Sequence, residues 1–343
     1  MFDYIIVGAG SAGCLLANRL SVNPANRVCL IEAGPRDGFL IRNCNPLNML
    51  ALMKSRTYNW GYSAEPQART GNRRFFWPRG RALGGSSSIN AMIYTRGHPS
   101  DYDQWAARGN PGWDYHSVLP YFRCSERQQR GADAWHGADG TMDVVDTNFR
   151  FPASSAFVQA CGEAGLPLNN DMNGAQQEGC GFFQVTQTPE GGRANSSRTF
   201  LDAALARPNL TVLTGVQVTR VCFDGKVASG VEISRGGAGA PREILSAARE
   251  VILSAGVINS PQLLKLSGIG PADELREHGI PLVHDLPGVG ENLQDHPDVI
   301  IRCLDKSGTS MSLAPTLRSL AFALRMLLQK PFVFTPTDCG GFV

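Results

Sequence analysis

Hydrophobic and polar positions in the first 34 residues follow the order strand, helix, strand. An apolar run ends at Val7, a glycine turn follows, and helical periodicity continues through about Leu20. A second apolar run covers residues 27–32. The pattern predicts a βαβ unit with parallel strands at the start of the chain.

The rest of the chain alternates between loops and short strands. Residues 60–97 are rich in aromatic residues, arginine and glycine, and they predict loops with one helix start near residues 85–87. Residues 140–190 combine short apolar runs with turn signals such as Asn173-Gly174. β-branched runs then predict strands at residues 210–213, 216–223, 227–233 and 251–253, with a helix beginning near Asn259.

These patterns divide the chain into two interleaved domains. Residues 1–150 and 191–297 are predicted to form the first domain. Residues 151–190 and 298–343 are predicted to form the second domain, as two insertions into the first. We therefore predict an α/β fold, with a Rossmann-type domain that carries an inserted α+β domain.

Composition excludes several classes of protein. Hydrophobic residues make up 43% of the 343 residues and charged residues 18%, which predicts a globular chain with a large core. The formal net charge is only +2 and the basic residues are scattered, so nucleic acid is not an expected partner. Nine cysteines form no CxxC pair, which favours a reduced, cytoplasmic chain without a disulfide framework or a metal site.

Targeting and membrane signals are weak. The strand-like run begins at Phe2, so no signal peptide is expected, and no uninterrupted apolar run reaches transmembrane length. Residues 320–334 are apolar around nearly the whole helix circumference, and Arg325 and Lys330 could face lipid headgroups. Burial of this helix within its own protein is the favoured alternative. We therefore expect a cytoplasmic protein with at most peripheral contact with the inner membrane.

The glycine turn after the first strand matches a dinucleotide-binding fingerprint. Gly8, Gly10 and Gly13 follow a predicted strand and open a predicted helix, with Ser11 and Ala12 between the last two glycines. Glu32, at the end of the second strand, is placed to accept hydrogen bonds from adenosine ribose hydroxyls. The fingerprint by itself leaves FAD and NAD both open.

Two long segments are similar to the signatures of the glucose-methanol-choline (GMC) oxidoreductases. The first is residues 77–97, where Gly84-Gly85 precedes three serines, and the second is residues 254–270. The similarity extends through residues 288–296 to residues 340–342, so it covers essentially the whole chain. Val257 departs from the family pattern, which has a small residue there. The resemblance implies an FAD-binding domain and an inserted substrate domain.

The resemblance also implies which residues contact FAD. Some relatives attach FAD through a histidine just before the asparagine that matches Asn90, and this chain has Ile89 there, so we expect non-covalent FAD. For Ala33, Val218 on the adenine side, and Ala255, simple core packing is the alternative. The expected FAD-binding residues are Gly8, Gly10, Ser11, Ala12, Gly13, Glu32, Ala33, Gly84, Ser88, Asn90, Ala91, Met92, Ile93, Val218 and Ala255.

The reaction implied by the family is the oxidation of a small-molecule primary alcohol to an aldehyde, with electrons passed to a quinone or another acceptor. Choline dehydrogenase is the alternative within the family. Two further alternatives are a lyase in which the flavin is only structural, and an inactive FAD-binding fragment.

No histidine in this sequence is expected to be the catalytic base. An alcohol must lose its hydroxyl proton when it delivers hydride, and histidine is the usual base. In the family this histidine lies near the carboxyl terminus, which corresponds to positions beyond Val343, so we expect the chain to be a fragment. His296 and Asp298 are expected to line the substrate cavity, and the other five histidines are expected to be solvated or structural. Choline-oxidising relatives tend to have glutamate where this chain has Asp298, so choline is expected to be a poorer substrate than an uncharged medium-chain or aromatic alcohol.

Overall fold

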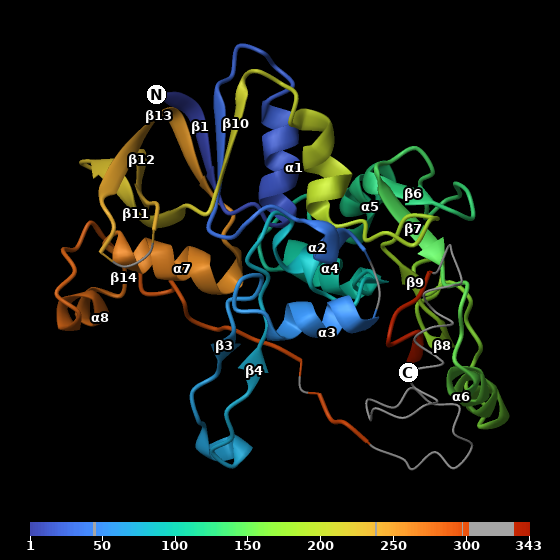
Figure 1. The fold of residues 1–343 in the computed structure, drawn as a ribbon. Helices are drawn as coiled ribbons and strands as arrows, with labels where there is room; N and C mark the ends of the chain where they lie inside the picture. Colours follow the sequence, from blue (N-terminus) through green and yellow to red (C-terminus); the bar gives the residue numbers. More distant parts are fainter. Residues whose placement is uncertain (44–45, 237–238, 297, 302–332) are drawn as a thin grey trace. The chain divides into compact units, whose positions relative to one another are not determined.

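The computed structural model describes residues 1–43, 46–236, 239–296, 298–301 and 333–343 (Figure 1). The chain forms two compact units, which we call unit 1 and unit 2. Unit 1 contains Met1–Ile41, Leu47–Ile89 and Asn195–Val299. Unit 2 contains Arg42–Pro46, Asn90–Ala194 and Ile300–Val343.

A six-stranded sheet with the strand order β10-β2-β1-β13-β12-β11 forms the centre of unit 1. The first four strands run parallel to one another, and β12 and β11 add an antiparallel edge. This mixed α/β architecture with a parallel sheet confirms the predicted fold class. The strands are β1 (Phe2–Val7), β2 (Val28–Glu32), β10 (Leu210–Thr214), β11 (Gln217–Asp224), β12 (Val227–Ser234) and β13 (Arg242–Leu253).

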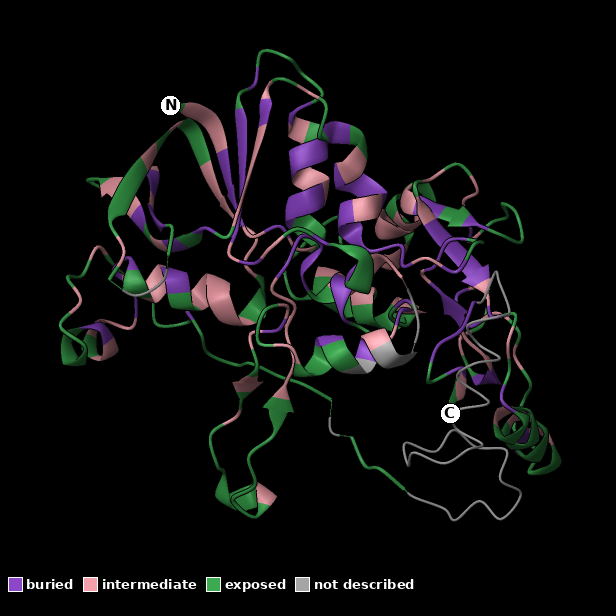
Figure 2. Ribbon diagram, in the orientation of Figure 1, coloured by how far each residue is buried: buried purple, intermediate pink, exposed green. Residues whose placement is uncertain are grey.

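Alternate residues of β1 pack on opposite faces of this sheet. Ile5 and Val7 join a buried cluster that includes Leu263 of helix α7 (Gly256–Leu266). Ile6 points the other way, toward Gly13 of helix α1 (Ser11–Leu20). Both faces of a parallel strand are therefore covered, which is why β1 and β2 read as continuous apolar runs. Figure 2 colours β2 and the second half of β1 as buried.

The other elements of unit 1 are short and include two small two-stranded sheets, β3-β4 and β14-β15. The elements are α2 (Phe39–Arg42, which ends in unit 2), α3 (Pro46–Lys54, which begins there), β3 (Tyr62–Ser63), η1 (Ala68–Thr70), β4 (Phe76–Trp77), η2 (Gly85–Ser88), the π-helical turn η3 (Ser197–Leu201), η4 (Asp202–Ala204), β14 (Ile269–Gly270), α8 (Ala272–Glu277) and β15 (His284–Asp285).

Unit 2 is built on a four-stranded sheet of order β5-β9-β7-β6 and a two-stranded sheet, β16-β8. Its elements are β5 (Ile93–Tyr94), α4 (Pro99–Ala107), α5 (Tyr115–Ser125), β6 (Glu126–Gln128), β7 (Met142–Asp146), α6 (Pro152–Glu163), β8 (Gly179–Phe182), β9 (Gln184–Val185) and β16 (Cys339–Phe342).

Most predicted elements of unit 1 match the structure, with two differences in extent. Strand β13 covers 12 residues rather than residues 251–253. Its first part is exposed and pairs with β12, so this part contains no apolar run from which a strand could be predicted. Helix α7 begins at Gly256, three residues before the predicted start near Asn259. The boundaries of the two units also differ from the predicted domain boundaries. Residues 90–150, predicted in the first domain, belong to unit 2.

The membrane prediction for residues 320–334 falls almost wholly outside the described residues. Among the described residues, no helix has the length and apolar character needed to span a bilayer. The seven cysteines in the described part of the chain are free thiols.

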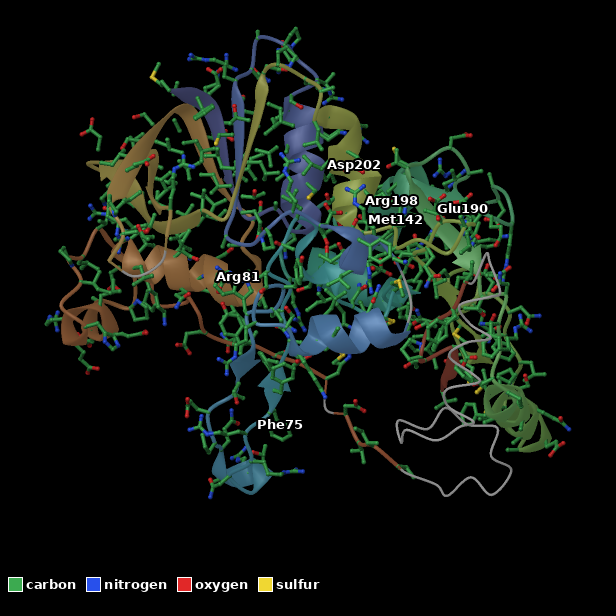
Figure 3. The ribbon with its side chains drawn as sticks, in the orientation of Figure 1. Phe75, Arg81, Met142, Glu190, Arg198 and Asp202 are labelled. Atoms are coloured by element: carbon green, nitrogen blue, oxygen red, sulfur yellow. The ribbon has the colours of Figure 1, made fainter. Side chains whose placement is uncertain are left out.

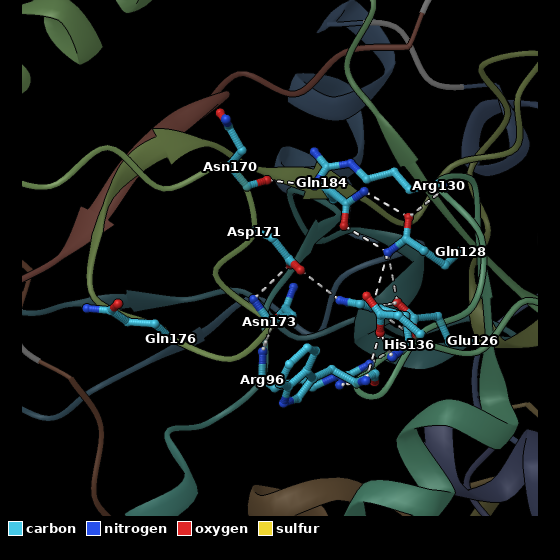
Figure 4. A network of polar contacts seen from close by, with 12 residues as sticks. Arg96, Glu126, Gln128, Arg130, His136, Asn170, Asp171, Asn173, Gln176 and Gln184 are labelled. Atoms are coloured by element: carbon cyan, nitrogen blue, oxygen red, sulfur yellow. Dashed lines mark hydrogen bonds and ion pairs between the residues drawn. The ribbon is translucent and has the colours of Figure 1, made fainter.

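A buried network of charged groups holds the loops of unit 2 together (Figure 4). Glu126 is fully buried and accepts a hydrogen bond from Arg96 Nη2 at 2.8 Å. The two ring nitrogens of His136 lie 3.0 Å from Glu126 Oε1 and 3.0 Å from Asp171 Oδ2. Two carboxylates can accept from both nitrogens only when the ring is protonated. Hydrogen bonds to Asp171 and Glu126 accordingly raise the pKa of His136 to about 9.

This network makes the stability of unit 2 depend on pH. The unfolded histidine has its ordinary pKa of 6.5 and the folded one about 9, so the stabilisation is complete below pH 6.5 and is lost as the pH rises toward 9. The free energy of unfolding is expected to fall by about 3 kcal/mol at most across this window. Urea unfolding of His136→Gln should show no such loss between the two pH values. An equal loss in the variant and the unaltered protein would contradict the assignment.

Candidate active site

Three neighbouring parallel strands end at one edge of the sheet in unit 1. Gly8 follows β1, Glu32 ends β2, and Ser254 follows β13. Backbone hydrogen bonds connect them: Gly8 N donates to Ile31 O at 2.8 Å, and Ser254 N donates to Val7 O at 2.7 Å. The crevice outside the carboxyl ends of parallel strands is where α/β folds bind ligands.

The three glycines of the fingerprint differ in what surrounds them. Gly8 has φ +96°, and a Cβ there would lie 2.6 Å from Ser254 O. A Cβ on Gly13 would lie 1.9 Å from Gly8 O. On Gly10 the nearest described atom would be Ser254 O, at 3.9 Å. Gly8 and Gly13 are therefore required by the protein's own packing, whereas Gly10 leaves space that a ligand can enter.

Helix α1 points its amino terminus at this space. The structure describes the helix throughout, and it has neither a side-chain cap at Gly10 nor an acidic residue in its first turn. Ser11 and Ala12 are exposed at this end. Backbone N–H groups and the positive end of the helix dipole at a glycine turn favour an anion such as a pyrophosphate.

Glu32 connects the ends of two loops. Its Oε2 accepts from Ala9 N at 3.0 Å, and its Oε1 accepts from Gly34 N at 2.9 Å. Burial raises the pKa of Glu32, and these two amide hydrogen bonds oppose the rise. Each carboxylate oxygen has a second lone pair, so the group can still accept from a hydroxyl of a ligand.

A second glycine turn packs directly on the first. Gly84, with φ +89°, donates its N–H to Ala9 O at 2.8 Å. A Cβ on Gly85 would lie 2.7 Å from the Cα of Gly10. Ser88 is fully buried; its hydroxyl donates to Leu83 O at 2.7 Å and accepts from Asn195 Nδ2 at 2.8 Å. The predicted ligand residue Ser88 thus supports the turn from behind.

Asp37 and Asn195 take part in this support and were not predicted from the sequence. Asn195 Nδ2 also lies 3.2 Å from Asp37 Oδ2, and Ser197 Oγ donates to Asp37 Oδ1 at 3.1 Å. Both Asp37 and Asn195 are buried. A buried polar pair that braces a turn has no short sequence motif, since its members are more than 150 residues apart.

The family's sequence profile, described as GMC oxidoreductase, matches residues 2–298. This chain belongs to the GMC oxidoreductase family. Members of the family are FAD-dependent enzymes acting on CH–OH donors. The glycine turns, the helix terminus and Glu32 fit such a group, since Gly10 leaves room beside an uncapped helix end.

Named relatives are similar to this GMC oxidoreductase chain over much of its length. An alcohol dehydrogenase [acceptor] of Pseudomonas putida is 46% identical over 100% of this chain and 62% of its own length. The mitochondrial choline dehydrogenase of Homo sapiens is 47% identical over 88% of this chain and 51% of its own length. An FAD-dependent oxidoreductase from Chaetomium thermophilum has a similar structure, with a TM-score of 0.78, 34% identity, and coverage of 84% of this chain and 51% of its own. The chain thus spans about half to two thirds of the length of these proteins.

The remaining residues of unit 1 that were expected to contact FAD occupy different environments. Val218 is 7% exposed and its side chain packs in the main core cluster. Ala33 and Ala255 are half-buried, and Ala255 N donates to Ser260 Oγ at 3.1 Å at the start of α7. Arg81, labelled in Figure 3, lies with its guanidinium carbon 5.2 Å from the ring centre of Trp60. Its charge also lowers the pKa of Glu32, although burial has the larger effect.

Residues 90–93 belong to unit 2. Asn90 is exposed, Ala91 and Ile93 are half-buried, and Met92 is buried with φ +64°. Asn90 Oδ1 accepts from Met92 N at 3.2 Å, so these residues form a tight turn before β5. Ile89, which precedes the turn, is buried.

Four of the six histidines lie in irregular chain, at the end of a helix or within a helix. His296 and Asp298 lie exposed in irregular chain of unit 1, where His296 N donates to Asp295 Oδ1 at 3.0 Å. His98 caps α4, and His278 ends α8. His116 lies in the first turn of α5, which Asp114 caps.

One group in the described residues has the composition of a metal site. Asp133, His136 and Asp171 bring ligand atoms within 4.8 Å of one another. Both ring nitrogens of His136 already face carboxylates, and the raised pKa of His136 opposes the neutral form that a metal needs. The group therefore acts as an ion-pair network.

The glycine geometry predicts opposite effects of the same substitution at two positions. Gly13→Ala should lower the free energy of unfolding by about 3 kcal/mol or more, because its methyl group would overlap Gly8 O. Gly10→Ala should cost about 1 kcal/mol or less, since only a helix-cap preference is affected. Urea denaturation without added flavin measures both values. Equal losses would show that packing, rather than a ligand, requires Gly10.

Proposed function

We propose that this chain binds FAD non-covalently through unit 1, and that the protein oxidises a primary alcohol to an aldehyde. The observation that carries the proposal is the open space beside Gly10, next to the uncapped end of α1. In this proposal, the amides of the turn at residues 8–13 and the turn at residues 84–88 hold the pyrophosphate. Glu32 accepts from the ribose hydroxyls.

The residue before Asn90 supports the proposal that FAD binds without a covalent bond. Ile89 has no nucleophilic atom, and its side chain is buried. In unit 1, Val218 contributes the adenine side through its backbone in this proposal, because its side chain is committed to the core. Ala33 and Ala255 complete that side. Residues 90–93 lie along the isoalloxazine ring.

Bound FAD would supply the hydride acceptor for the reaction. The chain must supply a group that takes the proton of the alcohol, and histidine has the appropriate pKa. His296 is exposed in the described chain, and we assign it and Asp298 to the lining of the substrate cavity. That the base lies beyond Val343 stays a prediction.

The substrate we favour is an uncharged alcohol, although similarity alone points equally to an alcohol dehydrogenase and to choline dehydrogenases. A carboxylate near a quaternary ammonium stabilises it, and Asp298 reaches less far than a glutamate would. The electron acceptor is a quinone or another oxidant. A lyase with a structural flavin, or a chain that binds FAD without turnover, is the alternative.

The cofactor proposal predicts release of intact FAD on denaturation. Gly10→Ala should weaken FAD binding about tenfold or more, because its methyl group occupies the space beside the phosphates. Gly38→Ala is the matched control, since no described atom lies within 4 Å of a Cβ there. Flavin fluorescence during titration measures both affinities. Flavin that remains attached to the unfolded polypeptide, or NAD in its place, would refute this part.

The reaction is tested by adding alcohol to the FAD-loaded full-length protein without oxygen. Loss of the flavin absorbance supports the dehydrogenase, whereas product with unchanged absorbance supports a lyase, and no change of either kind supports the inert form. An uncharged medium-chain or aromatic alcohol should reduce the flavin faster than choline does. Asp298→Glu should shift the ratio of kcat/KM values toward choline. A strong preference of the unaltered protein for choline would overturn the substrate assignment.

A further inference from the structure

The turn at residues 90–93 contains a strained residue. Three residues other than glycine have positive φ in the described chain: Asn72, Met92 and Asn292. Asparagine tolerates this conformation, whereas methionine does not gain the local hydrogen bonds that compensate asparagine. Met92 is also only 1% exposed. Its surroundings must therefore impose the conformation, and such imposed strain is typical of ligand-contacting segments.

Hydrogen bonds from unit 2 fix successive carbonyl groups of this turn. Thr335 Oγ1 donates to Ala91 O at 2.7 Å. Thr186 donates to Met92 O twice, from its N–H at 2.8 Å and from its hydroxyl at 3.3 Å. Ile93 then pairs with Val185 in the sheet. Each residue of the turn after Asn90 is thus held from the protein side.

Arg193 holds the remaining residue, Asn90. Its Nη1 donates to Asn90 O at 2.8 Å and to Asn90 Oδ1 at 2.9 Å. The same Oδ1 accepts from Met92 N. Arg193 therefore orients the side chain that closes the turn around the strained residue.

Burial and backbone pairing restrict the position of Arg193 itself. It is 1% exposed, its N–H donates to Arg42 O at 3.2 Å, and it pairs with Gln187 in an isolated bridge. Burying a guanidinium costs free energy, and a planar group with fixed donors keeps one orientation. Asn90, by contrast, is exposed. The buried cation fixes an exposed asparagine.

We propose that Arg193 is a positioning residue for the flavin-facing turn, and that it sets the orientation of Asn90 and Met92 toward the isoalloxazine ring. The inference rests on the proposed function, in which residues 90–93 lie along that ring. Backbone dipoles fixed before the reaction stabilise developing charge without reorganising. A turn released from Arg193 would relax toward the ordinary conformation of methionine and move these dipoles.

The test compares Arg193→Met with Arg193→Lys in FAD-loaded full-length protein. The methionine variant should change the visible absorbance and circular dichroism of bound flavin and slow its reduction by alcohol about 10- to 100-fold. Lysine keeps a charged donor and should restore most of both properties. Arg207→Met is the control, because Arg207 Nη1 also donates to a backbone carbonyl and a side-chain oxygen, those of Asn18 and Ser21 in unit 1. It should leave the flavin spectrum unchanged.

A double-mutant cycle with Asn90→Ala gives the second arm of the test. If Arg193 acts through Asn90, the double variant should be scarcely worse than the worse single variant. A flavin spectrum and reduction rate unchanged in Arg193→Met, with only a lower Tm, would overturn the inference, as would additive effects. If Arg193→Met does not fold, Arg193→Gln takes its place in both comparisons. Unaltered protein that binds no FAD would instead refute the proposed function, and the inference with it.

Discussion

Close contact between glycine backbones is the constraint on which the candidate site depends. Gly13 packs on the carbonyl of Gly8, and Gly8 in turn packs on Ser254. Gly85 packs on the Cα of Gly10. No side chain fits in these contacts, so three distant parts of the chain meet within van der Waals distance. The amino end of α1 and the carboxyl ends of β1, β2 and β13 thereby reach one place.

The candidate site has opposite electrostatic character at its two ends. The uncapped turn of α1 presents amides and the positive end of its dipole, which suits phosphate. Glu32 presents a buried carboxylate at the carboxyl end of β2, which suits hydroxyl groups. Because the amides of Ala9 and Gly34 already hold the carboxylate, it is oriented before any ligand arrives. This division of charge is the physical support for a dinucleotide and for the proposed placement of FAD.

The two units are stabilised by different forces. The sheet of unit 1 buries Ile5, Val7 and their neighbours in an apolar cluster, whose contribution does not depend on pH. Unit 2 buries charges instead, with Arg96, Glu126 and His136 in one network. The hydrogen bonds among these buried charged groups favour one arrangement, although Arg96 Nε has no hydrogen-bond partner among the described residues. That rigidity suits a unit that must also impose an unfavourable conformation on Met92.

The sequence by itself determined the βαβ unit, the glycine fingerprint, the family and the parallel sheet, because each depends on residues close together in the chain or on an uninterrupted apolar run. It did not determine the length of β13, the support of Ser88 by Asn195, or the role of His136, since each depends on a partner from elsewhere in the fold. The tertiary structure supplied the distances that distinguish Gly10, where a Cβ would meet no described atom closer than 3.9 Å, from Gly13, where a Cβ would lie 1.9 Å from Gly8 O. Both are glycines in one motif, and what surrounds each of them decides the difference.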